Sequence, residues 1–60
     1  MAKYSVQLEE LDVYEVIVDA DSEDEAERIG TAKLATGEGE RLDLYGQPGL
    51  ITVIKLEEEA

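Results

Sequence analysis

The segment that decides the fold reads Val13-Tyr14-Glu15-Val16-Ile17-Val18-Asp19-Ala20 and continues as Asp21-Ser22-Glu23-Asp24-Glu25-Ala26. In its first part, apolar side chains from Tyr14 to Ala20 occupy every second position and form one clean face, which is the period of a β-strand. In its second part, Ser22 and Glu25 form a capping box, and the acidic residues between them favour the positive end of a helix dipole. The sequence therefore predicts a strand over residues 13–20 that is followed directly by a helix.

Upstream of this segment, residues 3–9 show the same alternation, with Tyr4, Val6 and Leu8 on one face. The stretch over residues 9–12 is short and polar enough to connect two strands of a hairpin. We therefore expect the chain to begin with a β-hairpin.

Downstream, the helix has a narrow stripe of small and apolar residues that is suited to lying close on a sheet. The stripe recurs at spacings of three and four residues and comprises Ala26, Ile29, Gly30, Lys33 and Leu34. Gly37 and Gly39 are expected to end the helix.

Two further strands are expected over residues 41–45 and 50–56, joined by Gly46-Gln47-Pro48-Gly49. Pro48 and Gly49 suit the two central positions of a type II turn. Residues 57–60 are expected to form a frayed acidic tail. The predicted fold class is α+β: a single domain over residues 1–60, built as a small two-layer ββαββ unit in which one helix packs on one face of an antiparallel sheet.

The 60-residue chain has a net charge of -11, from 16 acidic and five basic residues. Such a charge favours disorder when a chain can bury little apolar surface. The regular apolar patterning opposes that interpretation, so a folded domain is expected. A chain this short buries only about 60% of its unfolded surface, so its stability is marginal without a metal, a disulfide or a partner subunit.

The composition excludes most catalytic chemistry. The chain has no Cys and no His, so it lacks a thiolate and the usual general base of a nucleophilic triad. A paired-carboxylate mechanism needs a cleft that a single core of this size does not easily provide. We expect no enzymatic activity, no catalytic residue and no cofactor.

One acidic stretch has the spacing of a calcium loop, with oxygen ligands at Asp19, Asp21, Glu23 and Glu27. It fails at two positions, because Asp24 stands where the loop needs glycine and Gly30 stands where it needs a bidentate glutamate. No metal site is expected.

The few basic residues are scattered, which disfavours direct binding to nucleic acid or to an anionic membrane surface. No apolar run is long enough for a membrane span, and the N-terminal residues lack the pattern of a signal peptide. A cytoplasmic location is expected.

Two stretches resemble the DpnD/PcfM-like small proteins of phages and other mobile elements: Tyr4-Ser5-Val6-Gln7-Leu8-Glu9-Glu10, and Tyr14-Glu15-Val16-Ile17-Val18-Asp19-Ala20-Asp21-Ser22-Glu23-Asp24-Glu25-Ala26. They match a pattern of an aromatic-led strand that ends in Glu, a valine-rich strand, and an acidic helix start. The resemblance is confined to residues 1–35. It implies a mobile-element origin and a small binding protein, and it brings no catalytic residue.

The acidic residues are concentrated in two places, more densely than capping of a helix requires. The helix start carries Asp19, Asp21, Glu23, Asp24, Glu25 and Glu27, and the first hairpin carries Glu9, Glu10, Asp12 and Glu15. A strong negative field of this kind could steer a basic partner and occupy its groove. The leading hypothesis is therefore an acidic, nucleic-acid-mimicking inhibitor that blocks the basic surface of a protein partner, such as a host defence or DNA-processing enzyme. Its expected partner-binding residues are Glu9, Glu10, Asp12, Glu15, Asp19, Asp21, Glu23, Asp24 and Glu27.

Two alternatives remain open. The first is a homo-oligomeric sponge for a nucleotide-like signalling ligand, with phosphate contacts from Lys3, Arg28, Lys33 or Arg41 and base stacking on Tyr4, Tyr14 or Tyr45. The second is a small structural or assembly protein without mimicry, in which a homodimer continues the sheet across the interface or covers apolar residues on the second face of the sheet. The residues expected to point away from the helix on that face are Val13, Ile17, Ile51 and Val53.

Overall fold

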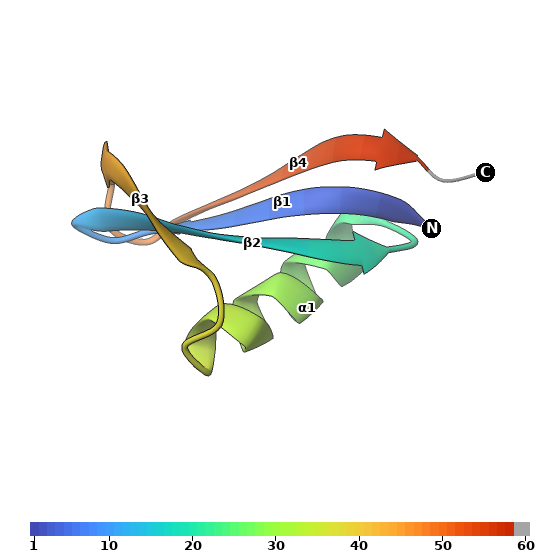
Figure 1. Cartoon of the computed structure of the whole chain (residues 1–60), viewed down its shortest axis with the longest axis horizontal. Helices are drawn as coiled ribbons and strands as arrows, with labels where there is room; N and C mark the ends of the chain where they lie inside the picture. The colour runs from blue at the N-terminus through green and yellow to red at the C-terminus, as the bar shows by residue number, and fades with distance from the viewer. Residues whose placement is uncertain (59–60) are drawn as a thin grey trace.

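Four strands form one antiparallel sheet in the order β3-β2-β1-β4, and one helix packs on one face of that sheet (Figure 1). The computed structural model describes residues 1–58. Along the chain the elements are β1 (Ala2–Glu9), β2 (Asp12–Ala20), α1 (Glu23–Ala35), β3 (Glu40–Tyr45) and β4 (Leu50–Glu58). The predicted two-layer ββαββ fold is confirmed.

The strands extend slightly beyond the predicted ranges. β1 and β2 pair over their whole lengths, from Ala2 opposite Ala20 to Glu9 opposite Val13. β4 continues past residue 56 and includes Glu57 and Glu58, because it pairs with the start of β1 there. The rest of the predicted acidic tail, residues 59–60, lies outside the described residues.

The start of α1 follows the predicted capping chemistry with one shift. The Ser22 hydroxyl accepts a hydrogen bond from the Glu25 backbone N–H at 3.2 Å. The Glu25 carboxylate accepts in return from the N–H of Asp21 at 3.1 Å, one residue before the cap. Both contacts satisfy backbone donors that a helix start leaves unpaired. The first turn is thereby fixed by Ser22 and Glu25.

The turn between β3 and β4 also has the predicted form. The N–H of Leu50 donates to the carbonyl of Gln47 at 3.1 Å. Gly49 has a φ of +88°, which a type II turn requires at its second central position.

The core lies between α1 and the two central strands. Its buried apolar residues are Ala2, Tyr4, Val6, Val18, Ala20 and Ala26. Gly30 allows the closest approach of the two layers, since a Cβ there would lie 2.5 Å from the Cβ of Val6. The small residues of the helix stripe therefore let the backbone of α1 lie close on β1, as the sequence pattern predicted.

The second face of the sheet has no helix over it, and its composition differs from the prediction. Val13 and Ile17 point away from the helix as expected, since their cross-strand neighbours Glu9 and Ser5 lie on that face. The prediction was wrong for Ile51 and Val53, which pair with Leu8 and Val6 and therefore lie on the helix side. The register in which β4 pairs with β1 decides which β4 residues face the helix. This register cannot be read from the β4 sequence alone. Leu50, Thr52 and Ile54 occupy the second face instead.

Candidate functional site

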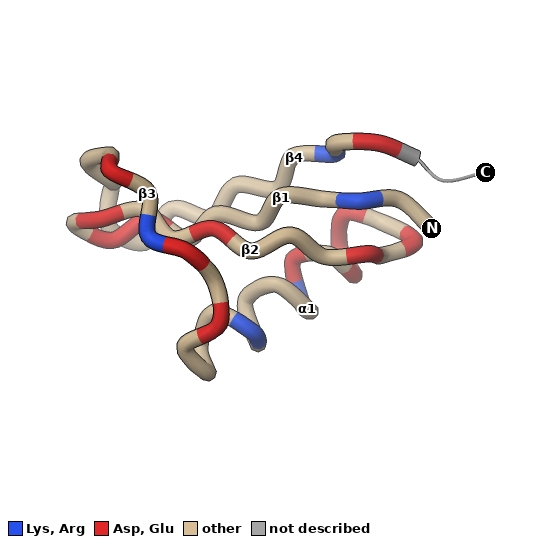
Figure 2. The backbone as a smooth tube through the Cα atoms, viewed as in Figure 1, with Lys and Arg blue, Asp and Glu red and all other residues tan. Residues whose placement is uncertain are grey.

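All but one of the residues expected to bind a partner lie at two opposite ends of the sheet (Figure 2), and the exception is Glu15. We call the first the hairpin end, which carries Glu9, Glu10 and Asp12 around the β1–β2 connection. We call the second the helix-start end, which carries Asp19, Asp21, Glu23, Asp24 and Glu27. Glu9 pairs with Val13 near one end of β1, and Lys3 pairs with Asp19 near the other. At about 3.3 Å per residue, the two ends are about 20 Å apart along the strands. The acidic residues therefore do not form one continuous face.

Most of the predicted acidic residues at the hairpin end hold the fold together. The carboxylate of Glu9 accepts a hydrogen bond from the backbone N–H of Gln47 at 3.0 Å, which ties the β3–β4 turn to β1. Asp12 lies 3.8 Å from the guanidinium of Arg41 on β3. Glu10 is exposed, and its carboxylate makes no hydrogen bond or ion pair within residues 1–58.

Glu15 lies between the two ends, on the face of the sheet that the helix leaves open. Its Oε2 accepts a hydrogen bond from the Ser5 hydroxyl at 2.6 Å and another from the side-chain amide of Gln7 at 3.2 Å. Ser5 is only 2% exposed, so Glu15 supplies the acceptor for a buried donor. Glu15 is thus part of a structural network that crosses β1 and β2.

The helix-start end is different, because most of its carboxylates have no structural partner. Asp19 forms an ion pair with Lys3 at 3.2 Å. Asp21, Glu23, Asp24 and Glu27 are all exposed, and within residues 1–58 their carboxylates make no hydrogen bond or ion pair. Since Ser22 and Glu25 already cap the helix, these four carboxylates are not needed to start it. They concentrate negative charge at one place, where those of the first helical turn complement the helix dipole and also repel each other.

Sequence reasoning missed one residue of this end. Glu57 of β4 is exposed and lies across from Lys3, on the opposite side of β1 from Asp19. The sequence predicts a frayed tail at this position, because nothing in an acidic C-terminal run distinguishes a strand from a frayed end. Only the pairing of β4 with β1 places it beside the helix-start end.

A groove of about 360 Å³ lies at the C-terminal end of α1. Its lining residues are Leu8, Glu10, Tyr14, Leu34, Gly37, Glu38, Gly39 and Arg41. Tyr14 and Arg41 are cross-strand neighbours on β2 and β3, and both line the groove. Of the other residues proposed for a nucleotide, Tyr4 is buried in the core and cannot stack on a ligand.

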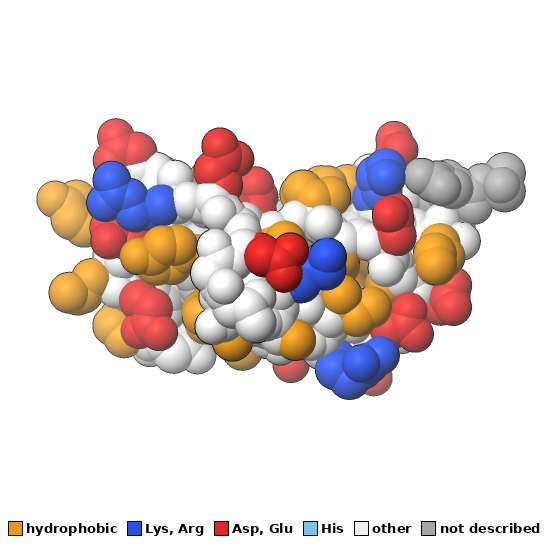
Figure 3. All heavy atoms as spheres, turned by 60° about the horizontal axis from the view of Figure 1, so that its bottom comes forward, with side chains coloured by type: hydrophobic (Ala, Val, Ile, Leu, Met, Phe, Trp, Pro, Cys, Tyr) orange, Lys and Arg blue, Asp and Glu red, His pale blue; other side chains and the backbone are white. Residues whose placement is uncertain are grey.

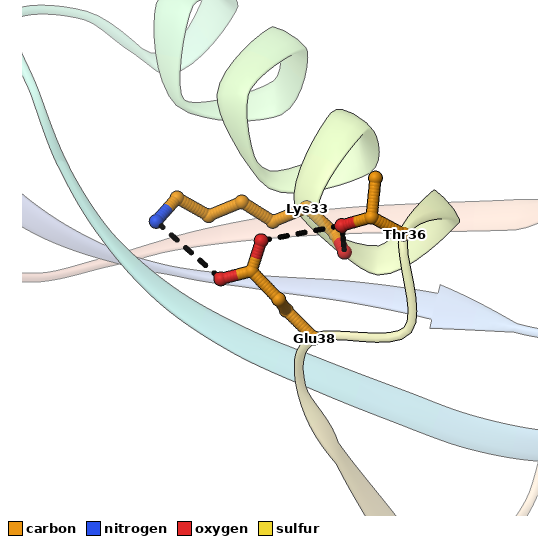
Figure 4. Close-up of polar contacts among 3 residues, drawn as sticks. All are labelled: Lys33, Thr36 and Glu38. Atoms are coloured by element: carbon orange, nitrogen blue, oxygen red, sulfur yellow. Dashed lines mark hydrogen bonds and ion pairs between the residues drawn. The ribbon is translucent and has the colours of Figure 1, made fainter.

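The rim of this groove is fixed by polar contacts at the helix C-terminus (Figure 4). The Thr36 hydroxyl lies 2.8 Å from the backbone carbonyl of Lys33 and 3.2 Å from a carboxylate oxygen of Glu38. The ammonium of Lys33 lies 4.0 Å from the other oxygen of Glu38. Lys33 therefore lies beside Glu38 as Arg41 lies beside Asp12, so each of these two basic side chains has an acidic neighbour.

Figure 3 shows exposed apolar side chains among charged ones at the hairpin end (left), and acidic side chains beside basic and apolar ones at the helix-start end (right). Leu11, Leu44 and Tyr45 of the hairpin end are all exposed, and Tyr45 is fully so.

Over the described part of the chain, no group of three or more acidic residues is arranged to hold a metal ion. No helix within residues 1–58 is long and apolar enough to cross a membrane.

Comparison of the chain with protein-family models, with curated proteins and with solved structures finds no match. The resemblance of residues 1–35 to DpnD/PcfM-like proteins therefore stays a prediction. The function has to be argued from the geometry of the two ends.

Proposed function

We propose that the protein is a non-enzymatic binding protein that blocks a basic surface of a protein partner with its helix-start end. The observation that carries this proposal is that the exposed carboxylates of Asp21, Glu23, Asp24 and Glu27 make no hydrogen bond or ion pair within residues 1–58. Basic surfaces of the required kind occur on enzymes that bind nucleic acid, because affinity for phosphates comes mainly from Lys and Arg.

The electrostatics of this end favour a cationic partner. Like charges at helix spacings destabilise each other by a few tenths of a kcal/mol per pair, about 0.2–0.5. A partner's Lys or Arg side chains would relieve that repulsion and form charge-assisted hydrogen bonds with the carboxylates. A concentrated negative field also accelerates encounter with a basic surface, and salt weakens this effect. Binding should therefore be strong at low ionic strength and weak at high ionic strength.

The nature of the partner follows from the resemblance to mobile-element proteins. If the chain is encoded by a phage or plasmid, a host defence or DNA-processing enzyme is the partner whose inhibition would benefit the element. The protein would then act as a nucleic-acid mimic in the cytoplasm of the host cell.

The test is an affinity capture from host lysate at low and high salt, repeated with two variants of equal charge. The first variant carries Glu23→Lys, Asp24→Lys and Glu27→Lys. The matched control carries Glu10→Lys, Glu40→Lys and Asp43→Lys, which are exposed positions outside the helix-start end whose carboxylates have no partner within residues 1–58. Both variants should keep the circular dichroism spectrum of the wild type.

We expect the wild type and the control to capture a basic nucleic-acid enzyme at low salt only, and the first variant to lose it. Purified enzyme should then bind the first variant at least 100-fold more weakly. Equal losses in both variants would mean that net charge alone governs binding, and unchanged binding of the first variant would refute the proposal.

A second candidate function rests on the groove that joins Tyr14 and Arg41. Its volume of about 360 Å³ is at the lower end of ligand sites, which start at about 300 Å³. A nucleotide-like ligand could stack on Tyr14 and place a phosphate on Arg41. Ligand binding raises the melting temperature by linkage, so a panel of cyclic and linear nucleotides should stabilise the wild type but not Arg41→Ala. The absence of any shift with the wild type would exclude this candidate.

A further inference from the structure

The two edges of the sheet differ in how well they are protected from further pairing. β3 (Glu40–Tyr45) is short, its pairing with β2 is irregular between Asp12 and Val13, and it carries Glu40, Arg41 and Asp43. Short length, irregular pairing and charge are the features by which natural sheets prevent an edge from adding another strand. β3 is therefore a protected edge.

β4 (Leu50–Glu58) is longer, and only its second half has such protection. Lys55 and the following glutamates are charged, and the register with β1 shifts between Lys3 and Tyr4, opposite that half. The first half, Leu50-Ile51-Thr52-Val53-Ile54, has no charged residue and pairs regularly with β1. Its large side chains are markedly exposed: Leu50 by 43%, Ile51 by 39% and Ile54 by 44%. An uncharged, apolar edge of this kind is a site for strand addition.

We propose that two copies of this chain pair antiparallel through residues 50–54 of β4, with the two-fold axis at Thr52. Thr52 would then face Thr52 of the second copy, Leu50 would face Ile54, and Ile51 would face Val53. Each chain contributes the same residues, as an isologous two-fold interface requires. The two sheets become one continuous antiparallel sheet.

The positions of the side chains are consistent with this register. Leu50, Thr52 and Ile54 lie on the open face, opposite Glu9, Gln7 and Ser5 of β1. Ile51 and Val53 lie on the helix side. Each proposed pair therefore joins residues of the same face, with aliphatic side chains beside aliphatic side chains and threonine beside threonine. Such cross-strand pairs each contribute about 0.2–1 kcal/mol.

The self-complementary pattern of residues 50–54 favours a second copy as the occupant, and charge does not oppose contact at this segment. Two chains of -11 repel each other over most of their surfaces, and salt bridges to a copy are scarce because each has only five basic residues. The segment over residues 50–54 is uncharged, so contact there brings no carboxylate of β4 into the interface. A basic partner would gain nothing from this segment and would be drawn to the acidic ends instead. The interface is also separate from the helix-start end, so a dimer leaves that end accessible.

The first test is the mass of the protein in solution as a function of concentration, measured by sedimentation equilibrium at moderate salt. The wild type should approach twice the mass of one chain. Thr52→Lys places two ammonium groups opposite each other at the axis and should weaken the dimer at least 10-fold. The matched control Leu44→Lys adds the same charge at an exposed position of the other edge and should leave the dimer intact.

Thermal unfolding of Thr52→Lys by circular dichroism separates dissociation from loss of the fold. A folded, monomeric Thr52→Lys supports the proposal. A wild type that stays monomeric up to millimolar concentration refutes it, and so does a dimer that Leu44→Lys disrupts and Thr52→Lys does not.

The second test fixes the register. Because the chain has no Cys, Thr52→Cys introduces a single thiol, which should form a disulfide with its copy under mild oxidation. The Cα atoms of directly opposed strand residues are about 4.5–5.5 Å apart, within the range that a disulfide spans. Tyr45→Cys is the matched control, since this exposed residue lies on the other edge. Equal cross-linking of both variants would indicate random collision and would contradict the proposed register.

Discussion

The two ends of the sheet are both acidic, yet they use their carboxylates in different ways. At the hairpin end, Glu9 anchors a turn and Asp12 lies near Arg41. At the helix-start end, Glu23 and Asp24 make no contact within the described part of the chain. Charge density alone therefore does not identify a binding surface. A carboxylate that accepts hydrogen bonds from its own fold is less available to a partner than an exposed one that makes no hydrogen bond or ion pair within residues 1–58.

The largest loss of stability is expected from a substitution at Gly30, which lies where α1 packs on the centre of β1. A Cβ at this position would lie 2.5 Å from the Cβ of Val6, so Gly30→Ala must push the helix off the sheet. Overpacking of this kind costs about 1–3 kcal/mol. At an exposed helix site the same change would gain up to about 1 kcal/mol. Thermal unfolding should therefore show a net loss of up to about 2 kcal/mol, and a gain in stability would contradict the packing described for α1.

An effect of similar size is expected at Glu15, whose removal tests whether the central carboxylate is structural. Glu15→Ala leaves the buried hydroxyl of Ser5 without its acceptor, which costs about 1–3 kcal/mol. Glu27→Ala removes a carboxylate of the same type that has no partner within residues 1–58, and it should change stability by less than about 0.5 kcal/mol. Urea denaturation of the two variants compares them directly. Equal losses would show that Glu15 has no special role.

The third prediction concerns the contribution of the N-terminal cap of α1 to stability. Ser22→Ala removes the acceptor for the N–H of Glu25 and should destabilise the fold by about 1 kcal/mol. Ser22→Asp retains an acceptor and should stay within a few tenths of a kcal/mol of the wild type, about 0.5 at most. If Ser22→Ala unfolded at the same urea concentration as the wild type, the capping contact would not contribute.

The smallest effect is expected from neutralising the helix-start carboxylates. Glu23→Gln with Asp24→Asn removes mutual repulsion but also removes charges that complement the helix dipole, and each effect is about 0.2–1 kcal/mol. The net change should be close to zero, and it should shrink further when salt is added. A large loss of stability in urea would mean that these residues serve the fold after all.

The sequence predicts local features well because their causes are local. The change of period at residue 21, the capping by Ser22 and Glu25, and the turn at Pro48 and Gly49 all depend on neighbouring residues, and the structure contains each of them. The close approach at Gly30 was also foreseeable from the small residues of the helix stripe.

The sequence does not predict features that depend on which strands pair and in which register. The placement of β4 beside β1 determines that Ile51 and Val53 lie on the helix side and that Glu57 lies across from Lys3. The same applies to the candidate site. Nothing in the sequence distinguishes the structural carboxylate of Glu15 from the exposed one of Glu27. Only the pairing of β1 with β2 brings Ser5 and Gln7 to Glu15.

The most direct test of the difference between the two ends is a titration of the isotope-labelled protein with a hexa-arginine peptide, followed by backbone NMR. The account predicts chemical-shift changes that are concentrated at residues 19–27 and 57, that are much smaller at residues 9–12, and that vanish at high salt. Glu23→Lys with Asp24→Lys and Glu27→Lys should abolish these changes and leave the weak response of the hairpin end in place. Equal shifts at both ends, or stronger shifts at the hairpin end, would contradict the claim that the helix-start end is the binding surface.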